Sequence, residues 1–352
     1  MRFSRVVRPA KSFFAILFLV SVAGASSLFA QSYDTEVSTV SYRPKSEFIF
    51  SRNGNSFVAT DASGVRRVVR NSFQFDEESV VIPDSVALKR IVAVSYYGAV
   101  YAVSEGDNGC GVTVFTQQST VSPEVLLSSE AGCVVTGARA NVADRLLVAI
   151  RTPTTTRLVL FLNGQVETLW DAADSGLVSP RLESFTINDL NTAPFTISHS
   201  VRGARQFSSF FWVPVRGTSP LVFPKSAGKR PVVRDANNKN KYLITVPKGV
   251  GVFDPAKRRV VISKVAANRL TSNGTPFNAT SIFPTNAART VAGCFAVGAL
   301  SGFKVQFAAI TDERELVLLG TSPSANRVAK VIPFTVNGYP QCTQRRTAPR
   351  RR

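Results

Sequence analysis

Apolar residues occur in short runs along most of this chain, and turn-forming residues separate the runs. Between Lys89 and Ser128 there are four runs of four to six residues: Arg90–Val94, Gly98–Val103, Gly111–Phe115 and Glu124–Leu127. They are rich in β-branched and aromatic residues, and few windows show the 3.6-residue period of a helix. This pattern predicts four strands of one antiparallel sheet.

Comparable four-strand units recur along the chain. Taking one residue from each predicted second strand gives spacings of 47 to 51 residues, at Ile49, Val100, Leu147, Ile197, Ile244 and Cys294. A unit of this length cannot bury both faces of its sheet alone, so neighbouring units must stack. The predicted fold is an all-β propeller of six four-stranded blades, with seven blades or a pair of β-sandwiches as alternatives.

The first unit is one strand short by this reading. Its predicted strands are Phe48–Phe50, Ser56–Ala59 and Val65–Val69, whereas an unassigned strand is predicted at Arg327–Phe334. We expect this C-terminal strand to supply the innermost strand of the first unit and so to close the ring.

The two ends of the chain differ from the repeat region. Residues 1–30 have the pattern of a signal peptide: four basic residues, the apolar run Phe13–Ala23, and small residues at two cleavage candidates, Ala25 and Ala30. An uncleaved anchor is the alternative, although the apolar run is short for a membrane span. We expect a polar leader at 31–46, the propeller domain at 47–342, a disordered basic tail at 343–352, and a secreted, periplasmic or envelope location.

The chain has four cysteines, an even number that favours disulfides in an exported protein. We expect neighbouring cysteines to pair, Cys110 with Cys133 and Cys294 with Cys342. In the predicted propeller, each pair would independently fall on adjacent blades. A zinc site is the alternative, but there is no Cys-x-x-Cys pair and His199 is the only histidine.

Two segments resemble the repeated Asn-Asp-x-Gly-x-Val-Ala-Phe unit of exported bacterial propeller-repeat proteins. They are Ile187-Asn188-Asp189 with Phe195-Thr196, and Asn141-Val142-Ala143-Asp144 with Val148-Ala149-Ile150, and both lack the glycine. The resemblance covers roughly residues 130–225. It implies a secreted or envelope-facing propeller of uncharacterised function, and it brings no catalytic residues.

The charge is strongly positive, with 42 Lys and Arg against 23 Asp and Glu. A basic protein favours anionic partners, here an anionic glycan, lipopolysaccharide or a protein partner, although the charge also serves solubility. In the propeller, one face would carry the basic residues Arg52, Arg151, Arg202, Arg205, Lys225, Lys229 and Lys248. The opposite loops would hold Asp61, Asp144, Asp189, Asp235, Asp254 and Asp312.

No constellation points to a particular enzyme. His199 has no nearby Gly-x-Ser-x-Gly, and neither a phosphate-binding loop nor a calcium-binding loop is present. Paired carboxylates of a glycosidase remain possible at Glu105, Asp107, Asp171 and Asp174, all beside turns where Asp is common. We therefore expect a monomeric, non-enzymatic binding module without cofactor, metal or nucleic acid. A carboxylate-dependent glycoside hydrolase or lyase and a structural envelope protein are the alternatives.

Overall fold

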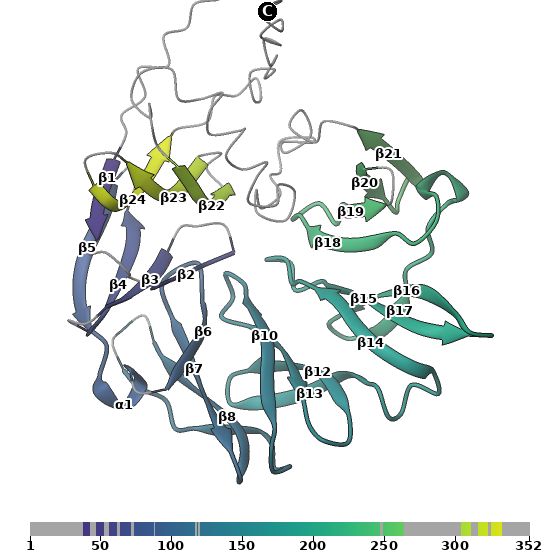
Figure 1. The fold of residues 1–352 in the computed structure, drawn as a ribbon, viewed down its shortest axis with the longest axis horizontal. Helices are drawn as coiled ribbons and strands as arrows, with labels where there is room; N and C mark the ends of the chain where they lie inside the picture. Colours follow the sequence, from purple (N-terminus) through teal and green to yellow (C-terminus); the bar gives the residue numbers. More distant parts are fainter. Residues whose placement is uncertain are drawn as a thin grey trace, which may run out of the picture. The chain divides into compact units, whose positions relative to one another are not determined.

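The computed structural model describes residues 38–42, 47–263 and 304–332, apart from short gaps at 53–55, 62–63, 72–73, 88, 117, 119, 247–248, 311–315 and 323–324. All of these belong to one compact unit, Val37–Arg352. They form six four-stranded antiparallel sheets (Figure 1). The fold is all-β, as predicted.

Five of the sheets are built from strands consecutive in the sequence. The first is β2 (Glu47–Phe50), β3 (Ser56–Asp61), β4 (Gly64–Asn71) and β5 (Gln74–Val81). The second is β6 (Arg90–Val94), β7 (Val100–Gly106), β8 (Gly109–Phe115) and β9 (Val125–Ser128). The third is β10 (Val134–Ala140), β11 (Leu146–Arg151), β12 (Thr156–Leu162) and β13 (Gln165–Asp171).

The fourth is β14 (Val178–Phe185), β15 (Ala193–Val201), β16 (Ala204–Val213) and β17 (Gly217–Pro220). The fifth is β18 (Val232–Ala236), β19 (Tyr242–Val246), β20 (Gly249–Asp254) and β21 (Arg259–Ser263). Two short helices, α1 (Asp84–Ala87) and η1 (Lys225–Ala227), lie in connections between sheets. Among the described residues, no helix is long and apolar enough to cross a membrane.

The sixth sheet joins segments from far apart in the sequence, in the order β1-β24-β23-β22. It contains β22 (Lys304–Ile310), β23 (Leu316–Ser322), β24 (Ala325–Ile332) and β1 (Ser38–Tyr42). Ser38 pairs with Val331 and Tyr42 with Arg327. The prediction that the C-terminal strand joins the first unit is therefore wrong, because this strand, β24, pairs with β1 and β23.

The first unit is complete without any strand from the C-terminus. Its fourth strand is β5, Gln74–Val81, whose polar sequence hid it from a search for apolar runs. The segment predicted as the unit's second strand, around Ile49, is its first strand, β2. Strand β1 lies inside the segment expected to be a polar leader. The predicted second strand around Cys294 lies outside the described residues.

Neighbouring sheets pack face to face through alternating residues of their middle strands. In β11, Leu146, Val148 and Ile150 pack with Tyr101 and Val112 of sheet β6–β9. The residues between them, Leu147 and Ala149, pack with Phe195 and Ile197 of sheet β14–β17. Because both faces of β11 are covered, its apolar run is continuous; full burial of one such leucine contributes roughly 1.5–3 kcal/mol.

Cys110 and Cys133 form a disulfide, as predicted, with their Cα atoms 5.5 Å apart. The bond joins the start of β8 to the segment just before β10, and so links two consecutive sheets. Cys294 and Cys342 lie outside the described residues.

Candidate functional site

The first and second strands of three consecutive sheets are joined by loops of one geometry, which begin at Asn141, Asn188 and Asn237. In each loop the Asn side-chain Oδ1 accepts a hydrogen bond from the backbone N–H four residues later, at 2.8 to 3.0 Å. The backbone N–H of the same Asn donates to the carbonyl of that later residue. In sheet β6–β9, Ser95 makes the same two bonds with Ala99.

The fourth residue of each loop has a positive φ: 53° at Asp144, 61° at Asn191, 51° at Asn240 and 91° at Gly98. Asn and Asp adopt the left-handed region more readily than other non-glycine residues. Asp144, Asn191 and Asn240 can therefore take this conformation, for which glycine serves at Gly98.

Side-chain amides link these loops from sheet to sheet. Asn141 Nδ2 donates to the carbonyl of Asn188 at 3.0 Å and to Asn191 Oδ1 at 2.8 Å. One sheet further on, Asn188 Nδ2 donates to the carbonyl of Asn237 at 3.0 Å and to Asn240 Oδ1 at 2.9 Å. The three sheets are thus held at a fixed spacing by one repeated set of hydrogen bonds.

A cavity of about 260 Å³ lies beside these loops, and equivalent residues of five sheets line it. Each is two positions before the first loop residue, which is Ser51, Ser95, Asn141, Asn188 or Asn237. The lining residues at this position are Ile49, Ala93, Arg139, Thr186 and Asp235. The first strands of five consecutive sheets, or the residue just after the strand in the case of Thr186, therefore border a common space.

A β-bulge in β18 brings two charged side chains to this cavity. Val233 pairs with Ile244 and Asp235 with Leu243, so Arg234 is an extra residue without an opposite partner on β19. A bulge changes the direction of the side chains around it. Both Arg234 and Asp235 line the cavity as a result.

Asp235 is paired with an arginine from a distant part of the chain. Its side chain is 1% exposed, and its Oδ1 accepts hydrogen bonds from Arg52 at 3.0 Å (Nη2) and 3.3 Å (Nε). Arg52 also donates to the carbonyl of Ala236 and lies 3.8 Å from the carboxylate of Asp189. The carboxylate in the cavity wall is therefore neutralised by a charge-assisted pair.

Two further arginines of the cavity have exposed side chains, Arg139 on β10 and Arg234 on β18. Arg139 donates to the carbonyl of Ala138 at 2.8 Å, and Arg234 to Thr245 Oγ1 at 2.9 Å. Desolvation by the surrounding protein lowers the pKa of Arg139. The carboxylate of Asp235 raises this pKa, and the positive charge of Arg52 lowers it further. Arginine nevertheless remains protonated at physiological pH.

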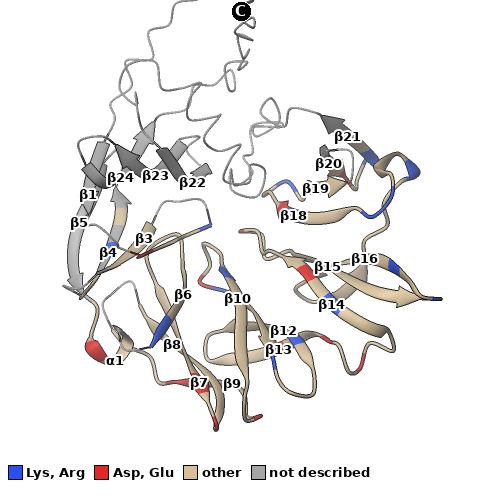
Figure 2. Cartoon of the chain, in the orientation of Figure 1, with Lys and Arg blue, Asp and Glu red and all other residues tan. Residues whose placement is uncertain are grey.

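Among the described residues, the cavity therefore presents three guanidinium groups and one carboxylate. Figure 2 marks the positions of Lys and Arg, and of Asp and Glu, along the described strands and loops. Since Asp235 is already paired with Arg52, the described lining residues supply no further negative charge to balance Arg139 and Arg234. Guanidinium groups bind carboxylate, sulfate and phosphate through paired hydrogen bonds. The arrangement suits an anionic group.

Of the predicted basic residues that the structure describes, Arg52 alone lines this cavity. It lies on the opposite end of its sheet from the one expected, because β2 is the first strand of its sheet and not the second. Asp61 changes ends for the same reason. The others are Arg151 and Arg202, exposed at strand ends, and Lys225 and Lys229, exposed in the connection between β17 and β18. Arg205 is paired with Glu183, and Lys248 lies outside the described residues.

The residues that the sequence offered as catalytic candidates have structural partners or lie at exposed turns. His199 lies in β15, and its Nε2 is 3.0 Å from Ser208 Oγ. Glu105 binds Arg90 and the backbone N–H of Val135. Asp171 binds Arg157 at 2.6 Å, while Asp107 and Asp174 are exposed. None of these residues lines the cavity that contains Arg52, Arg139 and Arg234, which is called the arginine cavity below.

Sequence reasoning missed Arg139 and Arg234. The signal that could have found them is their position relative to the loops, because Arg139 stands two residues before Asn141, and Arg234 directly precedes the equivalent position, Asp235. Without the bulge in β18, which the sequence does not reveal, Arg234 would point to the other face of its strand.

Among the described residues, no group of three or more His, Cys, Asp or Glu side chains is placed to hold a metal ion. No protein-family model and no curated protein matches the chain.

Several solved structures have a similar arrangement of strands. YCF48 from Cyanidioschyzon merolae is 13% identical, with 84% of this chain and 85% of that chain covered and a TM-score of 0.38. The gluconolactonase XC5397 from Xanthomonas campestris is 12% identical, with 84% and 89% covered and a TM-score of 0.38. The polysaccharide lyase Uly1 is 10% identical, with 83% and 78% covered and a TM-score of 0.34. At these scores the likeness assigns neither substrate nor partner.

Proposed function

We propose that this protein is an exported β-propeller binding module that takes up an acidic group of an anionic glycan in the cavity formed by Arg52, Arg139 and Arg234. The observation that carries the proposal is the excess of guanidinium groups over carboxylates in that cavity. The size of the cavity, about 260 Å³, suits the acidic end of a glycan better than a long segment of it.

The propeller arrangement is supported by the cavity itself. Five consecutive sheets contribute equivalent residues of their first strands to one space, as blades around a channel would. In this proposal the six sheets are six blades, and the pairing of β1 with β24 closes the ring by joining the two ends of the chain. In this arrangement segments from near the two ends of the chain are held in one sheet by backbone hydrogen bonds.

A binding role is favoured over glycoside cleavage by the charges in the cavity. A carboxylate-dependent hydrolase needs two carboxyl groups on either side of the scissile bond. Among the described residues lining the cavity, Asp235 is the one carboxylate, and it is held by Arg52. The predicted carboxylates Glu105, Asp107, Asp171 and Asp174 lie elsewhere.

Export is part of the proposal and has two sources of support. The N-terminal pattern of basic residues followed by the apolar run Phe13–Ala23 is typical of a signal peptide. The disulfide between Cys110 and Cys133 is of a kind that persists in oxidising compartments. Protein recovered from the periplasm or medium should have an N-terminus at Ser26 or Gln31, and a protein found only in the cytoplasm with Met1 retained would contradict export.

A binding panel tests the function. Carboxylated, sulfated and phosphorylated oligosaccharides are each compared with a neutral match, such as an oligogalacturonide with its methyl ester. We expect one acidic class to bind, its neutral match to bind at least tenfold more weakly, and the affinity to fall as salt rises. Equal affinity for acidic and neutral members, or no binding to any acidic class, would overturn the proposal.

A further inference from the structure

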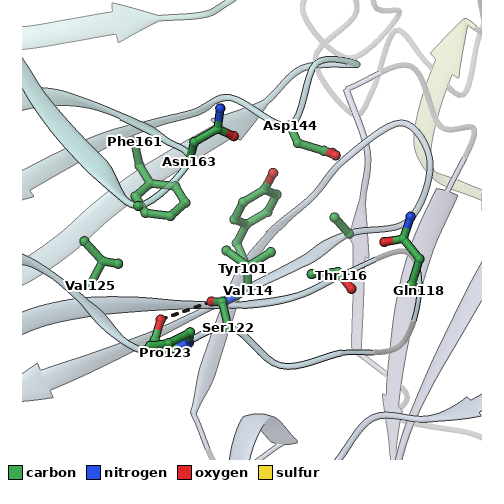
Figure 3. A pocket seen from close by; sticks show the side chains of 12 residues that line it. Tyr101, Val114, Thr116, Gln118, Ser122, Pro123, Val125, Asp144, Phe161 and Asn163 are labelled. Carbon is green, nitrogen blue, oxygen red and sulfur yellow. Dashed lines mark hydrogen bonds between the residues drawn. The ribbon is translucent and has the colours of Figure 1, made fainter.

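A second, larger cavity of about 510 Å³ lies between sheets β6–β9 and β10–β13 (Figure 3). Its walls come from β7, from the ends of β8 and β12, from the segment that leads into β9, and from the loop that begins at Asn141. No described residue lines both this cavity and the arginine cavity. Cavities of this volume are typical of sites for small organic ligands.

The inner wall of this cavity is apolar and includes an aromatic ring. Ala99 and Phe161 are 2% and 5% exposed, and the partly buried Val114 and Val125 pack against the same core. Figure 3 shows Phe161 and Val125 on the same side of the cavity. Aromatic rings pack favourably against one another in offset or edge-to-face arrangements. The wall therefore suits a ligand with an aromatic body.

Tyr101 brings a buried hydroxyl group to this wall. The residue is 0% exposed, and the hydroxyl has no hydrogen-bond partner among the described residues. Figure 3 shows the hydroxyl pointing into the space between Asp144 and Asn163. Because buried polar groups nearly always have a partner, an unpartnered hydroxyl aimed into a cavity calls for one from outside the chain.

The hydroxyl of Tyr101 is a hydrogen-bond donor. Desolvation by burial raises its pKa well above the usual value of 10.0, and the negative charge of Asp144 adds to the shift. The hydroxyl is therefore protonated at physiological pH, and its proton needs an acceptor. Asp144 also lines the cavity, but it is not free to bind a ligand, because it already has an interaction within the protein.

The other hydroxyl groups of the wall are already used. Ser122 Oγ accepts a hydrogen bond from the backbone N–H of Val114 at 2.9 Å and donates to the carbonyl of Pro123 at 3.1 Å. Thr116 Oγ1 lies 2.6 Å from Thr120 Oγ1. Burying an unpaired charge against such a wall is costly, whereas a neutral acceptor satisfies the buried hydroxyl without that cost.

From these observations we propose that the cavity binds a small neutral aromatic carbonyl compound, such as an aryl ketone. The carbonyl oxygen accepts a hydrogen bond from the hydroxyl of Tyr101, and the ring packs against Phe161, Val114 and Val125. This ligand carries no charge and its site shares no described residue with the arginine cavity, so the proposal does not depend on glycan binding.

The probe is acetophenone, and its controls have nearly the same shape. Cumene lacks the carbonyl oxygen, benzoate is an anion and benzamidine is a cation. Titration of the mature protein followed by ligand-observed NMR should show acetophenone binding about tenfold more tightly than each control. If any control binds as tightly as acetophenone, the proposal is wrong. It is equally wrong if neither acetophenone nor the larger ketone 4-phenylbutan-2-one binds.

A variant without the hydroxyl places the ligand. Tyr101→Phe keeps the ring, so it should bind acetophenone about tenfold more weakly and cumene as the wild type does. Its midpoint of thermal unfolding should not fall, because the hydroxyl has no partner among the described residues. The matched control is Tyr97→Phe, at an exposed tyrosine outside the cavity, which should leave both affinities within about twofold. Unchanged acetophenone binding in Tyr101→Phe, or equal weakening in the two variants, would contradict the assignment.

A partly filled cavity gives a second measurement. In Val125→Phe the larger side chain occupies part of the cavity and leaves the hydroxyl of Tyr101 in place. Acetophenone and cumene should then both bind more weakly, by about fivefold or more. Full retention of acetophenone binding in this variant would show that the ketone binds elsewhere.

Discussion

The guanidinium of Arg52 lies 3.0 Å from the carboxylate of Asp235, 183 residues further along the chain. The pair joins sheet β2–β5 to sheet β18–β21 at the edge of the arginine cavity. The pair has two effects on the cavity. It stabilises a nearly buried carboxylate, and it leaves the other two arginines of the cavity to meet a ligand.

Replacing Arg52 should destabilise the protein strongly. In Arg52→Met the carboxylate of Asp235, which is 1% exposed, loses its cation, and breaking a buried pair in this way costs about 3–5 kcal/mol. Asp235→Asn should cost less, because Arg52 is 14% exposed and can turn toward water. Urea unfolding followed by circular dichroism measures both values.

The matched control for this pair is Arg202→Met, which removes an exposed arginine and should change the free energy of unfolding by less than about 0.5 kcal/mol. If Arg52→Met costs no more than this control, the pair with Asp235 does not hold the sheets together.

The repeated amide contacts between sheets make a second prediction. Asn188 is 0% exposed; it donates to Asn237 and Asn240 and accepts from Thr192. Asn188→Ala should lower the free energy of unfolding by about 3 kcal/mol, since each buried group left unpaired costs roughly 1–3 kcal/mol. The exposed Asn163, replaced by Gly because its φ is 50°, should be nearly neutral. Similar losses of stability in both variants would show that the side-chain hydrogen bonds between the sheets do not stabilise the fold.

The disulfide should contribute measurably to stability. Cys110 and Cys133 are separated by 23 residues, and closing a loop of that size in the unfolded chain stabilises a protein by roughly 3 kcal/mol. The double variant Cys110→Ser, Cys133→Ser should unfold at a correspondingly lower urea concentration. The wild-type protein should match it when a reductant is present. An unchanged midpoint would mean that the bond adds nothing to the packing of the two sheets.

Asp171 gives a prediction about pH. Burial alone would raise its pKa, but hydrogen bonds from Thr155, Arg157 and the Ala173 backbone outweigh burial and lower it. A carboxyl with a lowered pKa in the folded state contributes stability above its unfolded pKa, near 4, and loses it as pH falls through the folded value. Asp171→Asn should therefore be less stable than wild type at neutral pH, and the difference should shrink below about pH 4.

Urea unfolding of wild type and Asp171→Asn across this pH range measures the effect, with Asp174→Asn as the exposed control. A difference between wild type and Asp171→Asn that stays constant down to acidic pH would show that the carboxylate gains nothing from its hydrogen bonds.

Strands that are buried on both faces could be predicted from the sequence. The continuous apolar runs of β11 and β19 identify them, and Asn163-Gly164 marks the hairpin between β12 and β13, where both residues have a positive φ. The bond between Cys110 and Cys133 was also predicted, as a pairing of cysteines that are neighbours in the sequence. These features depend on local sequence and on regular spacing.

Outer strands and charged lining residues could not be predicted in the same way. β1 and β5 are largely polar, so their sequences resemble loops, and missing β5 shifted the assignment of its whole sheet by one strand. Because of that shift, the predicted fold placed Arg52 at the wrong end of its sheet. Arg139 and Arg234 look like ordinary surface residues, because only the register of the first strands and the bulge in β18 direct them to the cavity.

The most direct test of the central claim is the affinity of the protein for the acidic glycan selected by the binding panel. Calorimetry would compare wild type with Arg139→Gln, Arg234→Gln and with the surface control Arg151→Gln, Arg202→Gln, which removes the same charge elsewhere. Loss of charge-assisted contacts worth about 1.5–3 kcal/mol each should weaken binding by the cavity variant at least tenfold. The surface variant should bind within about twofold of wild type. Equal weakening in both variants would show that the general positive charge, and not the arginine cavity, binds the ligand.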